Sequence, residues 1–193
     1  MKISRKEFKV LINDKEFFNL FSIGLKPIYQ KRQVTSLYFD TLDFERYIYS
    51  KIIDVDNFKI RIRTYSNDNN FYKEIKENTF EGRKKFTEKL NIETFADLNT
   101  LNVKNVEHFP SLFVEYTREY FLYKNCRITY DSDIKFWSHK FRTKSKIKKF
   151  YFKNVLEFKN HDNNEDIEKH LLFPPISFSK YNLGVEEIYG IKK

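Results

Sequence analysis

Charged side chains recur at alternate positions along several short segments of the chain, and their types suit phosphate chemistry. The clearest segment is Phe58 to Tyr65, in which Lys59, Arg61 and Arg63 alternate with apolar residues. The planar guanidinium group of arginine matches the oxygen atoms of a phosphate group. If several such faces come together, they predict a surface that binds an oxygen-rich anion.

Isolated glutamates accompany these cations. Glu7, Glu74 and Glu157 each lie two residues from a lysine. Carboxylates are hard oxygen ligands for a divalent cation, and one or two are enough when phosphates supply the remaining ligands. Each glutamate could equally be the ion-pair partner of its neighbouring lysine, and the sequence leaves both interpretations open for Glu7 and Glu74.

Alternation with period two dominates the chain and predicts an α+β protein that is mostly β, with a few flanking helices. We expect strands at Arg5 to Ile12, Thr35 to Asp40, Phe58 to Tyr65, Phe71 to Lys76, Arg83 to Leu90, Leu112 to Phe121, Arg127 to Asp131, Ile134 to Phe141 and Lys148 to Lys159. We expect helices at Asp14 to Phe21, Ile92 to Leu98 and Asn164 to Leu172, the last closed by Pro174 and Pro175.

The charged faces allow two architectures. An antiparallel sheet with one face on a core would leave them in water. A closed barrel would turn them inward, where unpaired cations are costly and require an anion or paired carboxylates. Arginines beside glutamates on several strands favour the second architecture, so we expect a closed antiparallel β-barrel of about eight strands.

Composition narrows the class of protein. The 193 residues fit a single domain spanning residues 1–193, and the net charge of +9 favours an anionic ligand. The single cysteine, Cys126, cannot form an internal disulfide. The charged N-terminus and the absence of a long apolar stretch predict no signal peptide and no membrane insertion, and hence a cytoplasmic protein.

Other chemistries find little support. The four histidines lack metal-ligand spacing. Neither GxGxxG nor GxxxxGK occurs, so side chains must hold any ATP. The basic run from Lys140 to Lys149 could be a nucleic-acid patch, but the aromatic residues lie in phase with apolar strand faces. Nucleic acid is therefore disfavoured as a partner.

Several segments together resemble the VTC domain of the vacuolar transporter chaperone polyphosphate polymerases, within the CYTH-like triphosphate tunnel metalloenzymes. The matching segments are RKEFK at Arg5 to Lys9, LYFDT at Leu37 to Thr41, KIRIRTY at Lys59 to Tyr65, KEIK at Lys73 to Lys76, RKKF at Arg83 to Phe86, EYTREYF at Glu115 to Phe121, RITYD at Arg127 to Asp131, LEFK at Leu156 to Lys159 and SKY at Ser179 to Tyr181. Their order and spacing span nearly the whole chain.

The resemblance implies a tunnel in which ATP donates its terminal phosphoryl group to polyphosphate in the presence of Mn²⁺ or Mg²⁺. The residues expected at the reacting phosphates are Arg61, Arg63, Lys76 and Arg127. The further phosphate-binding residues are Lys9, Lys85, Arg118 and Lys180, with Lys159 added because it is in phase with Glu157. Glu157 is the expected metal ligand, with Glu7 as a second, and Lys84 could replace Lys85 after a one-residue shift.

One departure from the wider superfamily bears on activity. The first strand reads Arg-x-Glu-x-Lys from Arg5 to Lys9, where tunnel phosphatases and cyclases commonly have Glu-x-Glu-x-Lys. This resemblance to the VTC branch favours a polymerase. Two alternatives stay open, namely a triphosphatase acting on tripolyphosphate or nucleoside triphosphate, and a non-catalytic polyphosphate-binding module.

Overall fold

The computed structural model describes residues 7–52, 57–79, 82–123, 125–139, 148–151, 153–159 and 174–191. They belong to two compact units, each assembled from separate stretches of the chain. Unit 1 comprises Met1–Gln33, Tyr116–Ile134 and Tyr151–Phe178, and unit 2 comprises Val34–Glu115, Lys135–Phe150 and Ser179–Lys193. Arg5, the helix expected at Asn164 to Leu172 and most of the basic run from Lys140 lie outside the described residues.

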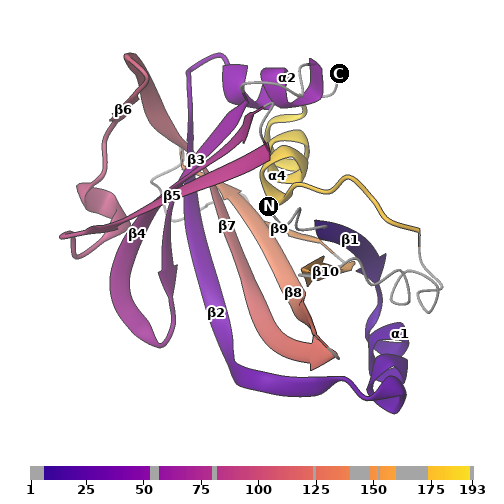
Figure 1. The fold of residues 1–193 in the computed structure, drawn as a ribbon. Coiled ribbons are helices and arrows are strands. Elements are labelled where there is room, and N and C mark those ends of the chain that lie inside the picture. Colours follow the sequence, from indigo (N-terminus) through magenta and orange to yellow (C-terminus); the bar gives the residue numbers. More distant parts are fainter. Residues whose placement is uncertain are drawn as a thin grey trace. The chain divides into compact units, whose positions relative to one another are not determined.

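The chain is mostly antiparallel β, as predicted. Its elements are β1 (Glu7–Ile12), α1 (Asp14–Asn19), η1 (Leu20–Ile23), β2 (Lys26–Asp40), α2 (Glu45–Ile52), β3 (Phe58–Tyr65), β4 (Asp68–Thr79), β5 (Gly82–Leu90), η2 (Phe95–Asp97), β6 (Leu101–Val103), β7 (Val106–Tyr123), β8 (Cys126–Ser138), β9 (Lys148–Tyr151), β10 (Asn154–Lys159) and α4 (Lys180–Tyr189), labelled where there is room in Figure 1. No helix among the described residues is both long and apolar enough to cross a bilayer.

The strands pair in the order β1-β10-β8-β7-β2-β3-β4-β5, with β6 added to β7 and β9 to β8. The described pairings therefore begin at β1 and end at β5 and do not close into a ring. The expected antiparallel sheet is present, and the expected closure by hydrogen bonds is absent from this part of the chain. A continuous ring would need β1 to pair with β5. Among the described pairings, β1 pairs with β10 and β5 pairs with β4.

In unit 1, β1, β10 and β8 form a ladder with one apolar face. Val10 pairs with Leu156, which pairs with Tyr130, and these side chains belong to one buried cluster. Helix α1 adds Phe17, whose ring stacks on Tyr130 with the centroids 3.7 Å apart. A capping box between Asn13 and Glu16 begins this helix, as the predicted Asn13 cap requires. The apolar face is thus covered, and the opposite face is left for charged residues.

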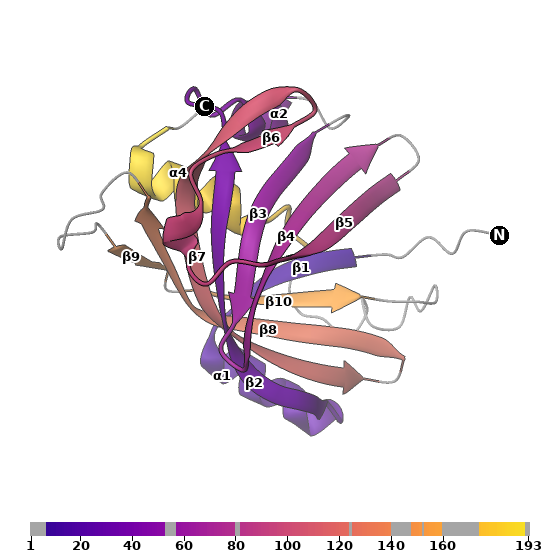
Figure 2. The ribbon, with the colours of Figure 1, turned by 90° about the vertical axis from the view of Figure 1, so that its left-hand side faces the viewer.

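In unit 2, β2, β3, β4 and β5 pair in sequence, and Figure 2 shows β3, β4 and β5 side by side. Leu37, Ile60, Ile62 and Phe71 lie on one face, in a buried cluster that also contains Trp137. Because successive side chains of a strand point to opposite faces, Arg61 and Arg63 lie on the other face. The alternation read from the sequence is therefore realised in the fold.

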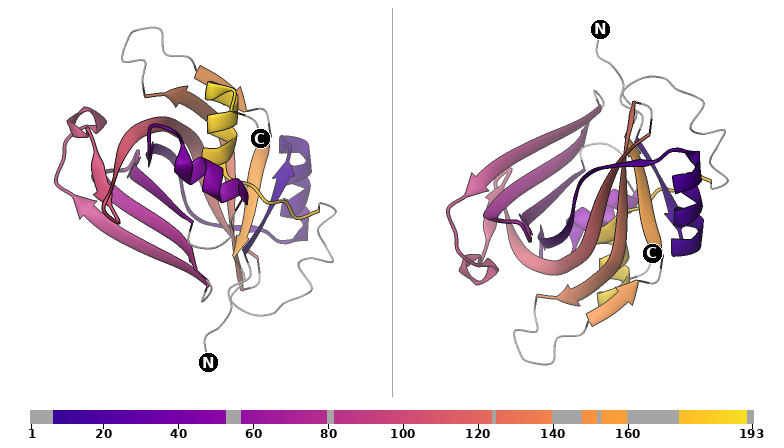
Figure 3. Two further views of the ribbon diagram at one scale, coloured as in Figure 1. Left: turned by 90° about the horizontal axis from the view of Figure 1, so that it is seen from above. Right: turned by 90° about the horizontal axis from the view of Figure 1, so that it is seen from below.

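Two helices of unit 2 were not predicted, and buried Asp40 connects them. Its carboxylate accepts hydrogen bonds from the backbone N–H groups of Arg46 and Tyr47 in α2 and from the Tyr181 hydroxyl in α4. Helices α2 and α4 lie next to each other in Figure 3. Between them, Lys51 Nζ is 2.6 Å from Glu186 Oε1. Burial raises the pKa of Asp40 even though these donors act in the opposite direction.

Three expected elements differ from the structure. The strands expected at Arg127 to Asp131 and Ile134 to Phe141 are one strand, β8, because Asp133 takes a positive φ of 53° without ending it. The segment Lys148 to Lys159 contains two strands, β9 and β10. The helix expected at Ile92 to Leu98 is only the 3-10 turn η2, which Thr94 caps through the Ala96 N–H.

Gly184 of α4 packs closely against Leu112 of β7 and Phe136 of β8, and this packing predicts the effect of a substitution on stability. A Cβ at Gly184 would overlap Leu112 Cδ2 and lie 2.7 Å from Phe136 Cδ1. We expect Gly184→Ala to lower the free energy of unfolding by about 1–3 kcal/mol, because overpacking outweighs the roughly 1 kcal/mol that alanine adds to helix propensity.

Urea unfolding of the two single variants and the double variant with Leu112→Ala provides the measurement. Truncating Leu112 alone should cost about 2–5 kcal/mol through the cavity that it leaves. The double variant should cost less than the sum, because the methyl group added at position 184 occupies the space that Leu112 vacates. Additive losses would contradict close packing at Gly184.

Candidate functional site

The pairing register of β2, β3, β4 and β5 determines which side chains lie on the polar face of unit 2. Across an antiparallel pair, opposed residues lie on the same face of the sheet. Tyr38 opposes Arg61, which opposes Glu74, and Glu74 opposes Thr87. The cations that this register places on the same face include Lys59, Arg61 and Arg63 of β3, Lys76 of β4, and Lys85 and Lys89 of β5.

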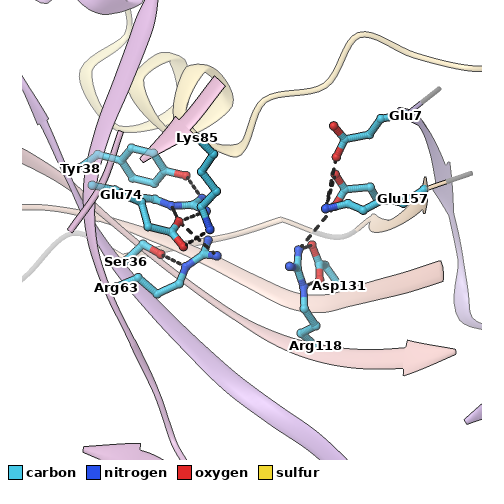
Figure 4. Close-up of polar contacts among 11 residues, drawn as sticks. Glu7, Ser36, Tyr38, Arg63, Glu74, Lys85, Arg118, Asp131 and Glu157 are labelled. Atoms are coloured by element: carbon cyan, nitrogen blue, oxygen red, sulfur yellow. Dashed lines mark hydrogen bonds and ion pairs between the residues drawn. The ribbon is translucent and has the colours of Figure 1, made fainter. Parts of the chain in front are cut away.

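One carboxylate lies at the centre of these cations. Arg61 donates from Nε and Nη2 to Glu74 Oε2 at 2.7 and 2.5 Å, and Arg63 Nη1 is 3.7 Å from the same oxygen. Lys85 Nζ donates to the other oxygen, Oε1, at 2.5 Å. Figure 4 shows Arg63 and Lys85 converging on Glu74. The Glu74 side chain is 3% exposed, so a single buried carboxylate pairs with three cations.

The electrostatics follow from this arrangement. Burial opposes ionisation of Glu74, but Arg61, Arg63 and Lys85 together hold its pKa far below the usual range. Burial likewise opposes ionisation of Tyr38, yet the positive charges of Arg61 and Arg63 and a hydrogen bond from Arg61 lower the pKa of its hydroxyl. Both shifts indicate a positive potential at this face that favours anions.

The structure distinguishes Lys85 from Lys84. Lys85 opposes Lys76 and reaches Glu74, whereas Lys84 opposes Glu77 on the other face of β4. The expected site residue Lys180 is the first residue of α4, and its charge also lowers the pKa of Tyr38. Lys59 donates to Ser179 Oγ and Asn182 Oδ1 and so holds the start of α4.

The polar face of unit 1 arises in the same way. Lys9 opposes Glu157, which opposes Thr129. Glu7 opposes Lys159, which opposes Arg127. Five of the residues expected at the site therefore share this face: Glu7, Lys9, Arg127, Glu157 and Lys159. The Arg127 side chain is exposed, while Lys9 Nζ donates to the Phe178 carbonyl at 2.8 Å.

Arg118 connects two buried carboxylates of unit 1. Its Nε and Nη2 atoms donate to Asp131 Oδ1 and Oδ2 at 2.6 and 2.7 Å, and Nη2 is 3.7 Å from Glu157 Oε2. Figure 4 shows Asp131 beside Arg118. Burial lowers the pKa of Arg118, but the charge and hydrogen bond of Asp131, together with the charges of Tyr116 and Glu157, outweigh burial and raise the pKa well above the usual value. Asp131 was not among the expected site residues, although it continues the phase of Arg127 and Thr129.

Glu7 and Glu157 form the strongest candidate for a metal site. Lys159 Nζ lies 3.3 Å from Glu7 Oε1 and 3.7 Å from Glu157 Oε1, so both carboxylates are within reach of one cation. Burial opposes ionisation of Glu157, but hydrogen bonding with Glu7 and the charges of Lys159, Arg118 and Lys9 hold its pKa well below the usual range. An ionised carboxylate is the form that binds a metal.

The described residues contain no group of three or more His, Cys, Asp or Glu side chains arranged for a metal ion. Two carboxylates nevertheless fit a Mg²⁺-like or Mn²⁺-like ion, because such ions commonly take one or two protein carboxylates and complete their shell with water and phosphate oxygens. Lys159 would have to yield its position between the carboxylates to such an ion.

The two faces differ in charge balance. In unit 2 the cations clearly outnumber Glu74. In unit 1 the cations Lys9, Arg118, Arg127 and Lys159 are nearly balanced by Glu7, Asp131 and Glu157. The unit 2 face therefore suits phosphate oxygens, and the unit 1 face offers both cations and metal ligands.

Comparison with known proteins agrees with the motifs. The family model of the VTC domain matches residues 3–106 and 84–189. Among curated protein sequences, none gives a significant match to the chain.

Solved structures share the fold. A "putative adenylate cyclase" from Bacillus halodurans is 15% identical, with a TM-score of 0.58 and coverage of 91% of this chain and 95% of that chain. The PH1819 protein from Pyrococcus horikoshii is 16% identical, with a TM-score of 0.56 and coverage of 95% and 99%. A Hippeastrum "putative adenylyl cyclase", described as having a dominant triphosphatase activity, is 12% identical, with a TM-score of 0.50 and coverage of 96% and 97%. Identities this low show the fold alone, and that fold matches the expected tunnel-like architecture.

The lowered pKa values of Glu74 and Glu157 predict acid sensitivity. A carboxylate whose pKa is lower in the folded than in the unfolded state stabilises the fold above the unfolded value of about 4.3, and this stabilisation is lost as the pH falls further. The free energy of unfolding should therefore decrease as the pH is lowered from about 6 to about 3.

Urea unfolding followed by circular dichroism over this pH range measures the slope. Glu74→Gln should be less stable than the wild type at neutral pH, and its stability should fall less steeply on acidification, because one titrating carboxylate is gone. Equal slopes for the two proteins would contradict the paired, ionised state of Glu74.

Proposed function

The chain belongs to the VTC domain family, and we propose that it is a metal-dependent enzyme that transfers the terminal phosphoryl group of ATP to a polyphosphate chain. The observation that carries the proposal is the cluster of Arg61, Arg63 and Lys85 around a single buried carboxylate, Glu74. Fixed cations in excess of their counter-charge are what a chain of phosphates requires.

The chemistry needs no covalent intermediate on the protein. A terminal oxygen of polyphosphate forms a bond to the γ-phosphorus of ATP while the bond from that phosphorus to the β,γ-bridging oxygen breaks, and ADP leaves. Catalysis of such a transfer consists mainly of alignment and of neutralising charge on the phosphate oxygens. Arg61, Arg63, Lys76 and Arg127 are assigned to the reacting phosphates, and Lys9, Lys85, Arg118, Lys159 and Lys180 to the remaining ones.

Glu157, with Glu7, is assigned to the divalent metal ion, Mn²⁺ or Mg²⁺. A bound metal ion would polarise phosphate oxygens and offset their charge. The pairing of Arg118 with Asp131 fixes the guanidinium group beside Glu157. These residues hold the carboxylate ionised and in a defined orientation.

A triphosphatase is the second candidate. The same fold occurs in the Hippeastrum protein described as having a dominant triphosphatase activity. The cations of unit 2 would serve either reaction, because the two differ only in whether water or polyphosphate attacks the phosphorus. The choice depends on the acceptor and not on the phosphate-binding residues.

One assay separates the candidates. The purified protein is incubated with ATP and Mn²⁺, and long-chain polyphosphate, free phosphate and ADP are measured together. Long chains with ADP support the polymerase, whereas free phosphate without chains supports the triphosphatase. Neither product, together with tight polyphosphate binding, supports a non-catalytic module.

Two variants test the assigned roles. Glu157→Gln should abolish metal-dependent turnover without unfolding the protein, because the amide is a poor metal ligand. Arg61→Ala should weaken tripolyphosphate binding by about tenfold or more, since a charge-assisted pair is lost. Lys73→Ala is the matched control, because Lys73 opposes Glu88 on the other face of β4. Unchanged turnover in Glu157→Gln, or equal effects of Arg61→Ala and Lys73→Ala, would contradict the assignments.

A further inference from the structure

Glu74 uses the donors of Arg61 that a phosphate would need. The Nε and Nη2 atoms of Arg61 form the edge that binds carboxylates and phosphates in a bidentate manner. Both atoms donate to Glu74 Oε2, at 2.7 and 2.5 Å, and Nη1 donates to the Tyr38 hydroxyl at 3.0 Å. While this arrangement persists, the side-on edge of Arg61 is occupied by Glu74, and Nη1 is engaged with Tyr38.

The other cations of the cluster are engaged with the same carboxylate. Lys85 donates to Oε1 at 2.5 Å, and Arg63 Nη1 lies 3.7 Å from Oε2 while its Nε donates to Ser36 Oγ. Figure 4 shows this arrangement around Glu74. An oxyanion placed beside these cations would also lie next to the negative charge of Glu74, which repels it. Simple addition of a phosphate is thus opposed twice, by occupied donors and by like charge.

We propose that the Glu74 carboxylate competes with phosphate groups for Arg61, Arg63 and Lys85, so that a phosphate binds to these cations by displacing the carboxylate. This inference rests on the proposed function. The exchange begins at Lys85, whose side chain is 47% exposed, against 5% for Arg63. Glu74 keeps the buried cations ordered and compensated when no phosphate is bound, and its return to them assists release of product.

The opposite role would be that of an anchor. If Glu74 only fixed Arg61 and Arg63 in position, its removal would disorder them and weaken phosphate binding. If Glu74 competes, its removal frees donors and lowers repulsion, so binding becomes tighter. The two roles predict effects of opposite sign on the same affinity.

Isothermal titration calorimetry with inorganic tripolyphosphate, in metal-free buffer at fixed ionic strength, measures that affinity. Glu74→Gln should bind about tenfold more tightly than the wild type, because one unit charge no longer opposes the ligand and the neutral amide oxygen accepts weaker hydrogen bonds from the cations than a carboxylate does. Glu88→Gln is the matched control. It removes the same charge from neighbouring β5, but Glu88 is 64% exposed and pairs with Lys73 on the other face. Its affinity should stay within about twofold of the wild type, because an exposed charge is screened.

The outcomes separate the inference from the proposed function. Binding by the wild type together with equal or weaker binding by Glu74→Gln would overturn the competition while leaving the phosphate site intact. If Glu88→Gln gained as much affinity for tripolyphosphate as Glu74→Gln, the gain would be explained by net charge alone. That result would also overturn the competition. Absence of binding in both the wild type and Glu74→Gln, in metal-free buffer and again with Mn²⁺ present, would overturn the proposed function and the competition together.

A second variant covers a failure of Glu74→Gln to fold. Glu74→Asp keeps the charge but withdraws it from the cations by one methylene group, so its pairs weaken. It should bind tripolyphosphate about threefold more tightly than the wild type, since weaker pairs are easier to exchange. Unchanged or weaker binding in a folded Glu74→Asp protein would contradict competition by Glu74.

Discussion

The need to compensate buried cations governs both polar faces of this protein. An arginine removed from water is tolerated only with a paired carboxylate and satisfied hydrogen bonds. Arg61 and Arg63 meet this requirement through Glu74, and Arg118 meets it through Asp131. Each unit therefore places a carboxylate deeper in the fold than the cations that it holds. The cations around Glu74 exceed its single negative charge, and this excess produces a positive potential at the unit 2 face.

The apolar faces of the same strands make this arrangement possible. In each unit, alternation places branched and aromatic side chains on a buried cluster. Burial of this surface supplies the main favourable term in folding, at roughly 25 cal/mol for each Å² removed from water. That contribution offsets the cost of holding like charges near one another on the opposite face. Helix α4, fixed by Asp40 through Tyr181, adds Lys180 to unit 2.

The two faces differ in charge balance, and the proposed reaction uses them for different groups. The excess of cations around Glu74 suits the phosphates, whereas Glu7 and Glu157 supply the hard oxygen atoms that a divalent ion requires. Both carboxylates already share one cation, the ammonium group of Lys159. On each face, a side chain of the protein thus occupies the position proposed for a ligand. Glu74 lies among the cations proposed to bind phosphate, and Lys159 lies near both carboxylates proposed to bind a metal ion.

The sequence by itself determined which residues share a face. Period-two alternation is local, so it placed Arg61 with Arg63, and Glu157 with Lys159, without knowledge of strand partners. It also predicted the extent of β3 and the capped start of α1 correctly. The resemblance to the VTC family, now confirmed by the family match, came from the same short segments.

Tertiary structure alone decided how these faces pair. Register across β4 and β5 chose Lys85 over Lys84, because a shift of one residue would send every side chain to the other face. Alternation places Asp131 in phase with Arg127, but only the tertiary structure shows that Asp131 pairs with Arg118 and that Tyr38 accepts a hydrogen bond from Arg61. Helices α2 and α4 escaped prediction because Asp40 and close packing at Gly184 stabilise them, and both contacts exist only in the folded chain.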